Sequence, residues 1–115
     1  MKTVSASQLL AARRSWIDAG KFRFHIERPT LLDVIRAGTG EAALSIDFAA
    51  RFVRGWEGVT ELDLIPGGDP EPAAFSSELF VAWIADRPDL WTAIAEGIAT
   101  AYKSHEEQNE ARGNA

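Results

Sequence analysis

Residues 52–91 read FVRGWEGVTELDLIPGGDPEPAAFSSELFVAWIADRPDLW and join two apolar segments through an acidic loop rich in proline and glycine. Three of the four tryptophans lie here, at positions 56, 83 and 91. Residues 66–70, PGGDP, exclude regular structure and predict a turn. Ser76 predicts the N-cap of a helix that has one apolar face, formed by Leu79, Phe80, Trp83 and Ile84.

The segments on either side of the loop carry helical periodicity. Upstream, residues 41–56 predict a helix, because Leu44, Phe48, Phe52 and Trp56 recur every four residues. Residues 59–65 alternate imperfectly, which allows a short edge strand. Downstream, Asp86 and Pro88 predict the start of a last helix, whose polar end is expected to fray into solvent. Its apolar stripe comprises Trp91, Ile94, Ala95, Ile98, Tyr102 and His105.

The N-terminal third contains the clearest period-two segment, FRFHIE at residues 22–27. A half-buried strand needs a partner, so we expect a β-hairpin formed by Ser15–Asp18 and Phe22–Glu27. Alternatively, Trp16 continues a helix that begins near Ser5 or Ser7 and is capped by Gly20.

Pro29 ends the expected strand, because it cannot donate a backbone hydrogen bond. Thr30 and Asp33 then predict the N-terminus of a short helix that buries Leu31, Val34 and Ile35. These elements predict a predominantly helical α+β fold with four to five helices and one N-terminal hairpin. We expect a single globular domain over residues 1–110 and a flexible tail over 111–115.

Charge is distributed unevenly along this chain of 115 residues and net charge −5. Residues 1–36 carry seven Lys/Arg against three Asp/Glu, and residues 57–89 carry eight acids against Arg87 alone. The acidic middle argues against nucleic-acid binding there, and the basic third has no nucleic-acid-binding motif. Such asymmetry is typical of steering a protein partner or of packing like subunits head to tail, but it also fits two solvated faces.

The sequence offers little for catalysis, cofactors or membranes. It has no cysteine, no phosphate-binding glycine loop and no apolar run approaching the roughly 20 residues that span a bilayer. We expect no signal peptide. His25 and His105 are the only histidines, too few for a convincing metal site. We therefore expect no enzyme, cofactor or metal, with a small metal-dependent enzyme or regulator using His25 as the least favoured reading.

Aromatic residues are the better candidates for function, because they dominate interface hot spots as well as cores. Trp56 and Phe75 flank the acidic loop, and Phe80 and Trp83 lie on the helix that follows it. We take these four residues as candidate partner contacts. Trp91 lies on a regular helical stripe and is expected in the core.

Two segments together resemble a known family. They are GWEGV followed by the acidic loop and FSSELFVAWIADRPDLWTAIAEGIATAY, and FRFHIERPTLLDVIRA upstream. Over most of residues 21–114 they resemble the tail assembly chaperones of long-tailed bacteriophages and prophages, the lambda-like minor tail assembly proteins. The loop TELDLIPGGDPEPAA, residues 60–74, is longer than is usual in that family.

The resemblance implies a non-enzymatic protein that binds the tape measure protein in the bacterial host cytoplasm and is absent from the mature virion. It also implies a possible frameshifted longer form that recruits the tail tube protein, and possible self-association. A small acidic protein with apolar helix faces suits that role, because its charge keeps the complex soluble. The alternative is a small structural component of the virion, such as a head–tail connector or tail-completion protein.

Overall fold

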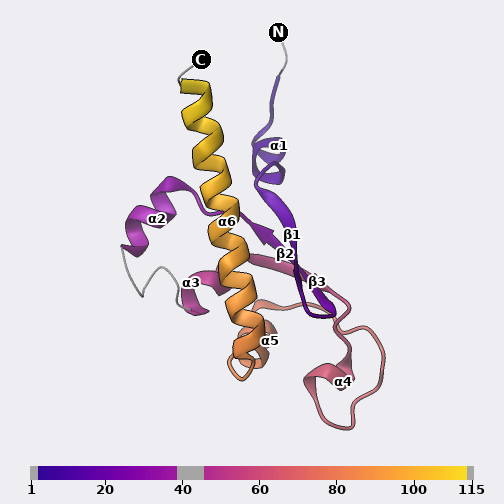
Figure 1. Ribbon diagram of the computed structural model, residues 1–115. Coiled ribbons are helices and arrows are strands. Elements are labelled where there is room, and N and C mark those ends of the chain that lie inside the picture. Colours follow the sequence, from indigo (N-terminus) through magenta and orange to yellow (C-terminus); the bar gives the residue numbers. More distant parts are fainter. Residues whose placement is uncertain (1–2, 39–45, 114–115) are drawn as a thin grey trace.

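A computed structural model describes residues 3–38 and 46–113 of the chain. Figure 1 shows a three-stranded antiparallel sheet crossed on one face by a long C-terminal helix. The elements follow in the order α1 Ala6–Ala11, β1 Arg14–Ala19, β2 Phe22–Glu27, α2 Leu31–Ala37, α3 Ile46–Ala50, β3 Val53–Glu57, α4 Glu61–Leu64, α5 Ser77–Ile84 and α6 Pro88–Gly113. The α+β fold is confirmed, and the described residues form six helices and three strands rather than four to five helices and one hairpin.

The expected hairpin is confirmed. β1 pairs antiparallel with β2, with Ile17 opposite Phe24 and Trp16 opposite His25. β1 is one residue longer at each end than predicted, and β2 has the predicted bounds. Trp16 therefore lies in a strand and not in a helix. Gly20 lies in the turn at a φ of 61°, a left-handed conformation that glycine adopts without steric cost.

The helix expected over residues 41–56 is wrong at its C-terminal end. α3 stops at Ala50, and β3 pairs antiparallel with β2, placing Trp56 opposite Phe24. Residues 41–45 lie outside the described residues. The physical reason is that β2 has a second open edge, whose backbone groups β3 satisfies. Gly55 also disfavours a helix, whereas valine and tryptophan favour a strand.

Local capping explains where most helices begin. Ser5, Thr30 and Ser76 each accept a hydrogen bond from a backbone N–H three residues later. The caps at Thr30 and Ser76 are as predicted, and of the two candidates Ser5 and Ser7 it is Ser5 that caps α1. The edge strand allowed at residues 59–65 is wrong, because Thr60 and Asp63 form a capping box that starts α4. α6 begins at Pro88, so the residue directly before it is Arg87, and the predicted N-cap at Asp86 is one residue too early.

The core lies between the sheet and α6. The inner faces of the strands supply Phe22, Phe24, Ile26 and Val53, and α6 supplies Leu90, Ile94 and Ile98. α6 approaches β1 closely at Gly97, where an added Cβ would lie 2.3 Å from Ile17 Cδ1. α3 and α5 flank α6 on the same side of the sheet (Figure 1).

Two sequence-based expectations, one about burial in α2 and one about fraying of α6, are not met. Leu31 and Ile35 were expected to be buried, but they are 62% and 65% exposed, because α2 packs extensively against no other described element. The polar end of α6, expected to fray, is helical to Gly113, although it is exposed as expected. Within the described residues, no helix combines the length and apolar character needed to cross a membrane.

Candidate functional site

The four aromatic residues singled out in the sequence meet in space. The Trp56 ring lies edge-on to Phe75, with centroids 5.2 Å apart, and edge-on to Trp83, with centroids 5.7 Å apart. Phe75 in turn lies 6.0 Å from Phe80. The end of β3, the end of the loop and α5 therefore converge on one aromatic cluster, which we define as Trp56, Phe75, Phe80 and Trp83.

This aromatic cluster faces inwards. Phe80 is only 2% exposed and packs on Phe24, while Trp83 packs on Phe22 of the same strand. Trp56, Phe75 and Trp83 are half-buried. In this conformation the cluster attaches α5 and the loop to the sheet. The role of these four residues in partner binding stays a prediction, because their contacts within the chain do not test it.

The loop after β3 is tied down by its own backbone. Thr60 and Pro72 form a β-bridge, and the Ala73 N–H donates to the Val59 carbonyl at 2.9 Å. The indole N–H of Trp56 donates to the Ala73 carbonyl at 2.8 Å. The aromatic cluster and the loop thus form one structural unit.

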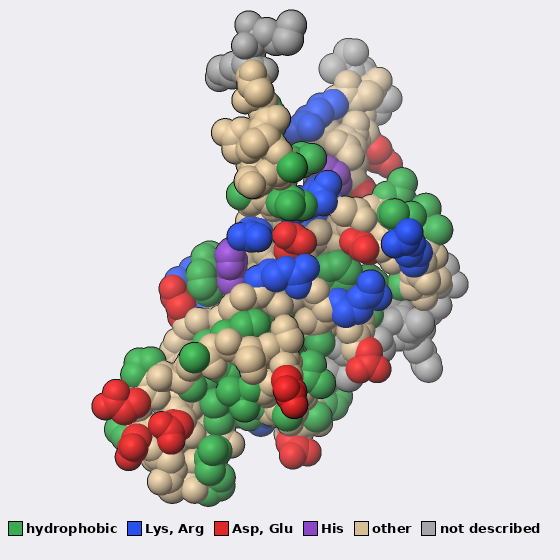
Figure 2. All heavy atoms as spheres, turned by 180° about the vertical axis from the view of Figure 1, so that it is seen from behind, with side chains coloured by type: hydrophobic (Ala, Val, Ile, Leu, Met, Phe, Trp, Pro, Cys, Tyr) green, Lys and Arg blue, Asp and Glu red, His purple; other side chains and the backbone are tan. Residues whose placement is uncertain are grey.

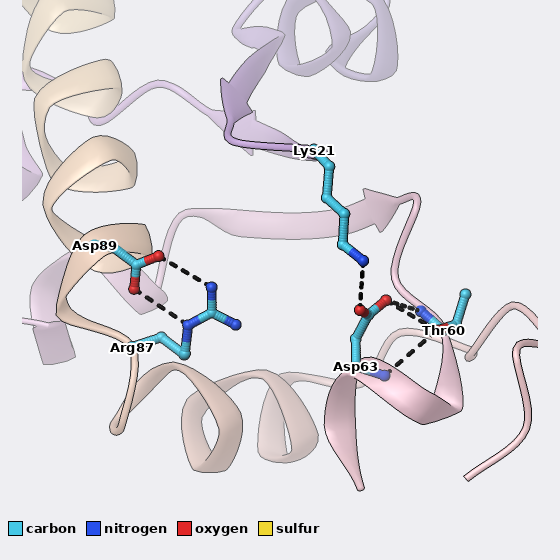
Figure 3. A network of polar contacts seen from close by, with 5 residues as sticks. All are labelled: Lys21, Thr60, Asp63, Arg87 and Asp89. Atoms are coloured by element: carbon cyan, nitrogen blue, oxygen red, sulfur yellow. Dashed lines mark hydrogen bonds and ion pairs between the residues drawn. The ribbon is translucent and has the colours of Figure 1, made fainter. Parts of the chain in front are cut away.

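Figure 3 shows a polar network at the edge of this unit. Lys21 Nζ, at the hairpin turn, lies 2.8 Å from Asp63 Oδ1 on α4. Asp63 also accepts hydrogen bonds from the Thr60 backbone N–H and hydroxyl, both at 2.9 Å. On the other side, the Arg87 guanidinium binds both carboxylate oxygens of Asp89, at 3.0 and 3.2 Å.

The two cations of the network also cover aromatic rings. Lys21 Nζ lies 5.2 Å from the Phe22 ring centroid, and the Arg87 guanidinium carbon lies 5.9 Å from it. Arg87 also lies 5.7 Å from the Trp83 ring. These cation–π contacts shield the rim of the aromatic core from water.

Acid should weaken the attachment of α4. The hydrogen bond from Lys21 and then that from the Thr60 backbone lower the pKa of Asp63 below its ordinary value of 3.8. A carboxyl with a lower pKa in the folded state adds stability above its unfolded pKa and loses it as the pH falls through the folded value. We expect Asp63→Asn to be less stable than the parent near neutral pH, with the difference vanishing well below about pH 3.8.

Urea unfolding at both pH values measures this difference. Asp69→Asn is the matched control, since Asp69 lies exposed in the same loop and its side chain forms no hydrogen bond or ion pair with the described residues. An Asp63→Asn deficit that is equally large in acid would contradict the proposed role of the ionised carboxylate.

An exposed apolar surface lies elsewhere, on α2. Leu31, Leu32 and Ile35 are all more than half exposed on this seven-residue helix. Val34 of the same helix contributes to a groove of about 160 Å³, which is lined by Pro29, Val34, Phe48, Ala49, Ala95, Ile98, Ala99 and Tyr102. We call the three side chains and this groove the α2 surface. Aliphatic and aromatic side chains supply nearly all of it.

Sequence reasoning missed the α2 surface, although it assigned the helix correctly. The signal was present in the composition of LLDVIRA, where Leu31, Leu32, Val34 and Ile35 occupy more of the helix than one buried face requires. Such a surplus of apolar side chains is typical of a helix with two apolar contacts, one to its own protein and one to a partner.

The histidines lie apart. His25 stacks on Trp16 on the outer face of the sheet, with ring centroids 4.7 Å apart, and His105 Nε2 lies 3.1 Å from Asn109 Nδ2 on α6. Over residues 3–38 and 46–113, no three His, Asp or Glu side chains converge to form a metal site.

No protein-family model matches this sequence, and no curated protein or solved structure is significantly similar to it. The likeness to tail assembly chaperones therefore rests on the short motifs quoted above. A function for the chain has to be argued from its surfaces.

Proposed function

We propose that this chain is a non-enzymatic tail assembly chaperone of a bacteriophage or prophage, which binds the tape measure protein and keeps it soluble while the tail tube forms. The α2 surface carries this proposal. A protein of this size gains nothing in its own stability from holding Leu31, Leu32 and Ile35 in water. Their burial by a partner would be favourable.

The shape of the α2 surface suits a helical partner. An apolar groove beside a row of aliphatic side chains can accept the apolar face of an amphipathic helix, which presents anchors one or two turns apart. A tape measure protein, as the family resemblance describes it, is long and helical and would present such faces repeatedly. Several copies of the chaperone would then cover one partner.

Charge supports the same role. Acidic side chains gather over α4 and its loop, where Glu61, Asp69 and Glu71 are exposed (Figure 2). The α2 surface belongs to a different part of the molecule, beside α3 and α6. A complex formed through α2 would leave the acidic end in solvent, where its charge opposes aggregation.

Co-expression with the tape measure protein encoded beside this chain tests the proposal. We expect the tape measure protein to become soluble and to co-purify with the chain. Leu31→Asp/Ile35→Asp should abolish the complex, because two desolvated charges would enter an apolar interface. The fold should be retained, since both side chains are largely exposed, and circular dichroism checks this.

Leu62→Asp/Ile65→Asp is the matched control. These residues are 51% and 58% exposed on α4 and its end, and the substitution changes the net charge equally. We expect this control to keep the complex. Equal solubility of the tape measure protein with and without the chain would reject the proposal.

Purified virions provide a second measurement. A chaperone that acts before the tube closes is absent from the finished particle, so mass spectrometry of virions should not detect this chain. Detection in a fixed number of copies per particle would favour a structural component, such as a connector or tail-completion protein, over a chaperone.

A further inference from the structure

A second concave surface, unrelated to the α2 surface, is strongly basic. It lies where α1 and the start of β1 face the C-terminal half of α6, and has a volume of about 390 Å³. Its basic lining comprises Arg13, Arg14, Arg28, His105 and Arg112, and among the described residues no Asp or Glu lines it. Basic side chains gather in this region in Figure 2. We call it the arginine pocket.

Most of this charge has no carboxylate partner within the described residues, although Arg28 Nη1 donates to the Pro29 carbonyl at 2.9 Å. Within the described residues, Arg13, Arg28 and Arg112 form no ion pair, whereas Arg14 lies 3.6 Å from Glu27. Glu27 also forms an ion pair with Arg54, whose Nη2 lies 3.2 Å from Glu27 Oε2. Three uncompensated guanidinium groups in one pocket are unexpected in a chain whose net charge is −5.

Arg13 carries one polar atom whose hydrogen-bonding capacity the protein does not use. Its Nε atom is buried and has no hydrogen-bond partner. A buried donor without an acceptor costs about 1–3 kcal/mol, and more when the group is charged. Buried polar groups in native proteins are usually satisfied by protein atoms or by ordered water.

The fold places these groups together. The Arg28 N–H donates to the Arg13 carbonyl at 2.7 Å, so the two residues lie side by side beyond the β1–β2 ladder. His105 and Arg112 are two helical turns apart and therefore project from the same side of α6. Ser104 and Gln108 add neutral donors to the same lining.

The electrostatics agree with this geometry. Burial and then Arg13 lower the pKa of Arg28 from its ordinary value. Burial, followed by Arg28, Arg112 and Arg13, lowers the pKa of His105, against an opposing effect of Glu106. The pocket therefore disfavours each additional positive charge and would be stabilised by an anion.

We propose that the arginine pocket binds the phosphate group of a small molecule, and that Arg13, Arg28 and Arg112 contact the phosphate oxygens. Guanidinium groups match the tetrahedral oxygens of phosphate through paired N–H donors. The pocket has the size of small-ligand sites, which occupy about 300–1,000 Å³. Its apolar wall, formed by Leu9, Ala12 and Ala101, would contact the rest of the ligand.

Titration with inorganic phosphate at constant ionic strength tests the site on the full chain. We expect saturable binding by calorimetry and saturable shifts of arginine side-chain N–H resonances by NMR, because guanidinium donors in the pocket gain a charged acceptor. Arg112→Gln should weaken binding roughly tenfold, since one charge-assisted hydrogen bond is lost. Arg112 is exposed near the end of α6, so the fold should not change.

Arg36→Gln is the matched control, because Arg36 is an exposed arginine on α2 outside the pocket. It should bind phosphate as the parent does. Bound phosphate should also raise the pKa of His105, as an anion favours the imidazolium form. If the rise in the pKa of His105 is reduced in Arg112→Gln but not in Arg36→Gln, the anion binds in the arginine pocket.

Two results would overturn the proposal. A linear, non-saturating response equal to that of sodium chloride would show only ionic-strength effects. Salt-sensitive self-association that Arg112→Gln removes, without phosphate binding, would show instead that carboxylates of a second copy occupy the pocket. Sedimentation velocity with and without phosphate separates these outcomes. Neither depends on the tape measure protein, so the proposed chaperone role is tested separately.

Discussion

Replacing Phe24 with alanine should lower the free energy of unfolding by about 3–5 kcal/mol, the usual range for a buried phenylalanine. Phe24 is 0% exposed, at the centre of the sheet's inner face. Its ring lies 5.7 Å from Phe80 and 6.3 Å from Trp83. Truncation removes the surface on which α5 packs and leaves a cavity that these rigid rings cannot fill.

Chemical denaturation measures this loss, and Trp16→Ala is the control. Trp16 is a larger aromatic residue on the same hairpin, but it lies on the outer face and is 42% exposed. We expect its replacement to cost roughly 1 kcal/mol, mainly through lost stacking on His25. Similar costs for both variants would mean that the inner face is not the core. Because domains are stable by only about 5–15 kcal/mol, Phe24→Ala should also melt at a much lower temperature.

Gly97→Ala should destabilise the protein even though alanine is the better helix former. The new methyl would lie 2.3 Å from Ile17 Cδ1 and 2.7 Å from Ile17 Cγ1, well inside contact distance. Overpacking of this kind costs about 1–3 kcal/mol, against a gain of about 1 kcal/mol in helix propensity. The difference is a net loss of up to roughly 2 kcal/mol, because α6 must move away from β1.

Two further variants identify the cause. Gly113→Ala makes the same change in the same helix, where an added Cβ meets nothing within 4 Å, and should not destabilise. Gly97→Ala/Ile17→Ala should lose less stability than the sum of its single changes, because the clash partner is gone. Additive losses would show that the contact between Gly97 and Ile17 is not the reason.

Much of the local structure could be predicted because its causes lie within a few residues. Ser5, Thr30 and Ser76 start helices by binding an N–H three residues ahead. The alternation in residues 22–27 requires a two-sided strand and hence a neighbour. The same reasoning applied to Thr60 and Asp63 would have found α4, since that capping box has the spacing seen at Thr30 and Asp33.

The third strand could not be found in this way. Phe48, Phe52 and Trp56 have helical spacing, yet the chain leaves the helix at Ala50 to pair with β2. That pairing depends on the open edge of a strand far away in the sequence. Local periodicity carries no information about which distant backbone groups still need partners.

The surfaces show the same division. The aromatic residues 56, 75, 80 and 83 could be selected from the sequence, but their burial depends on Phe22 and Phe24 lying beneath them. Leu31 and Ile35 look like core residues until α2 is seen to pack extensively against no other element of the described residues. Capping, turns and alternation are properties of neighbouring residues, and the sequence alone was enough for them. The third strand, the exposed α2 surface and the arginine pocket arise from contacts between distant segments, so they became visible only once α6 and the sheet were packed together.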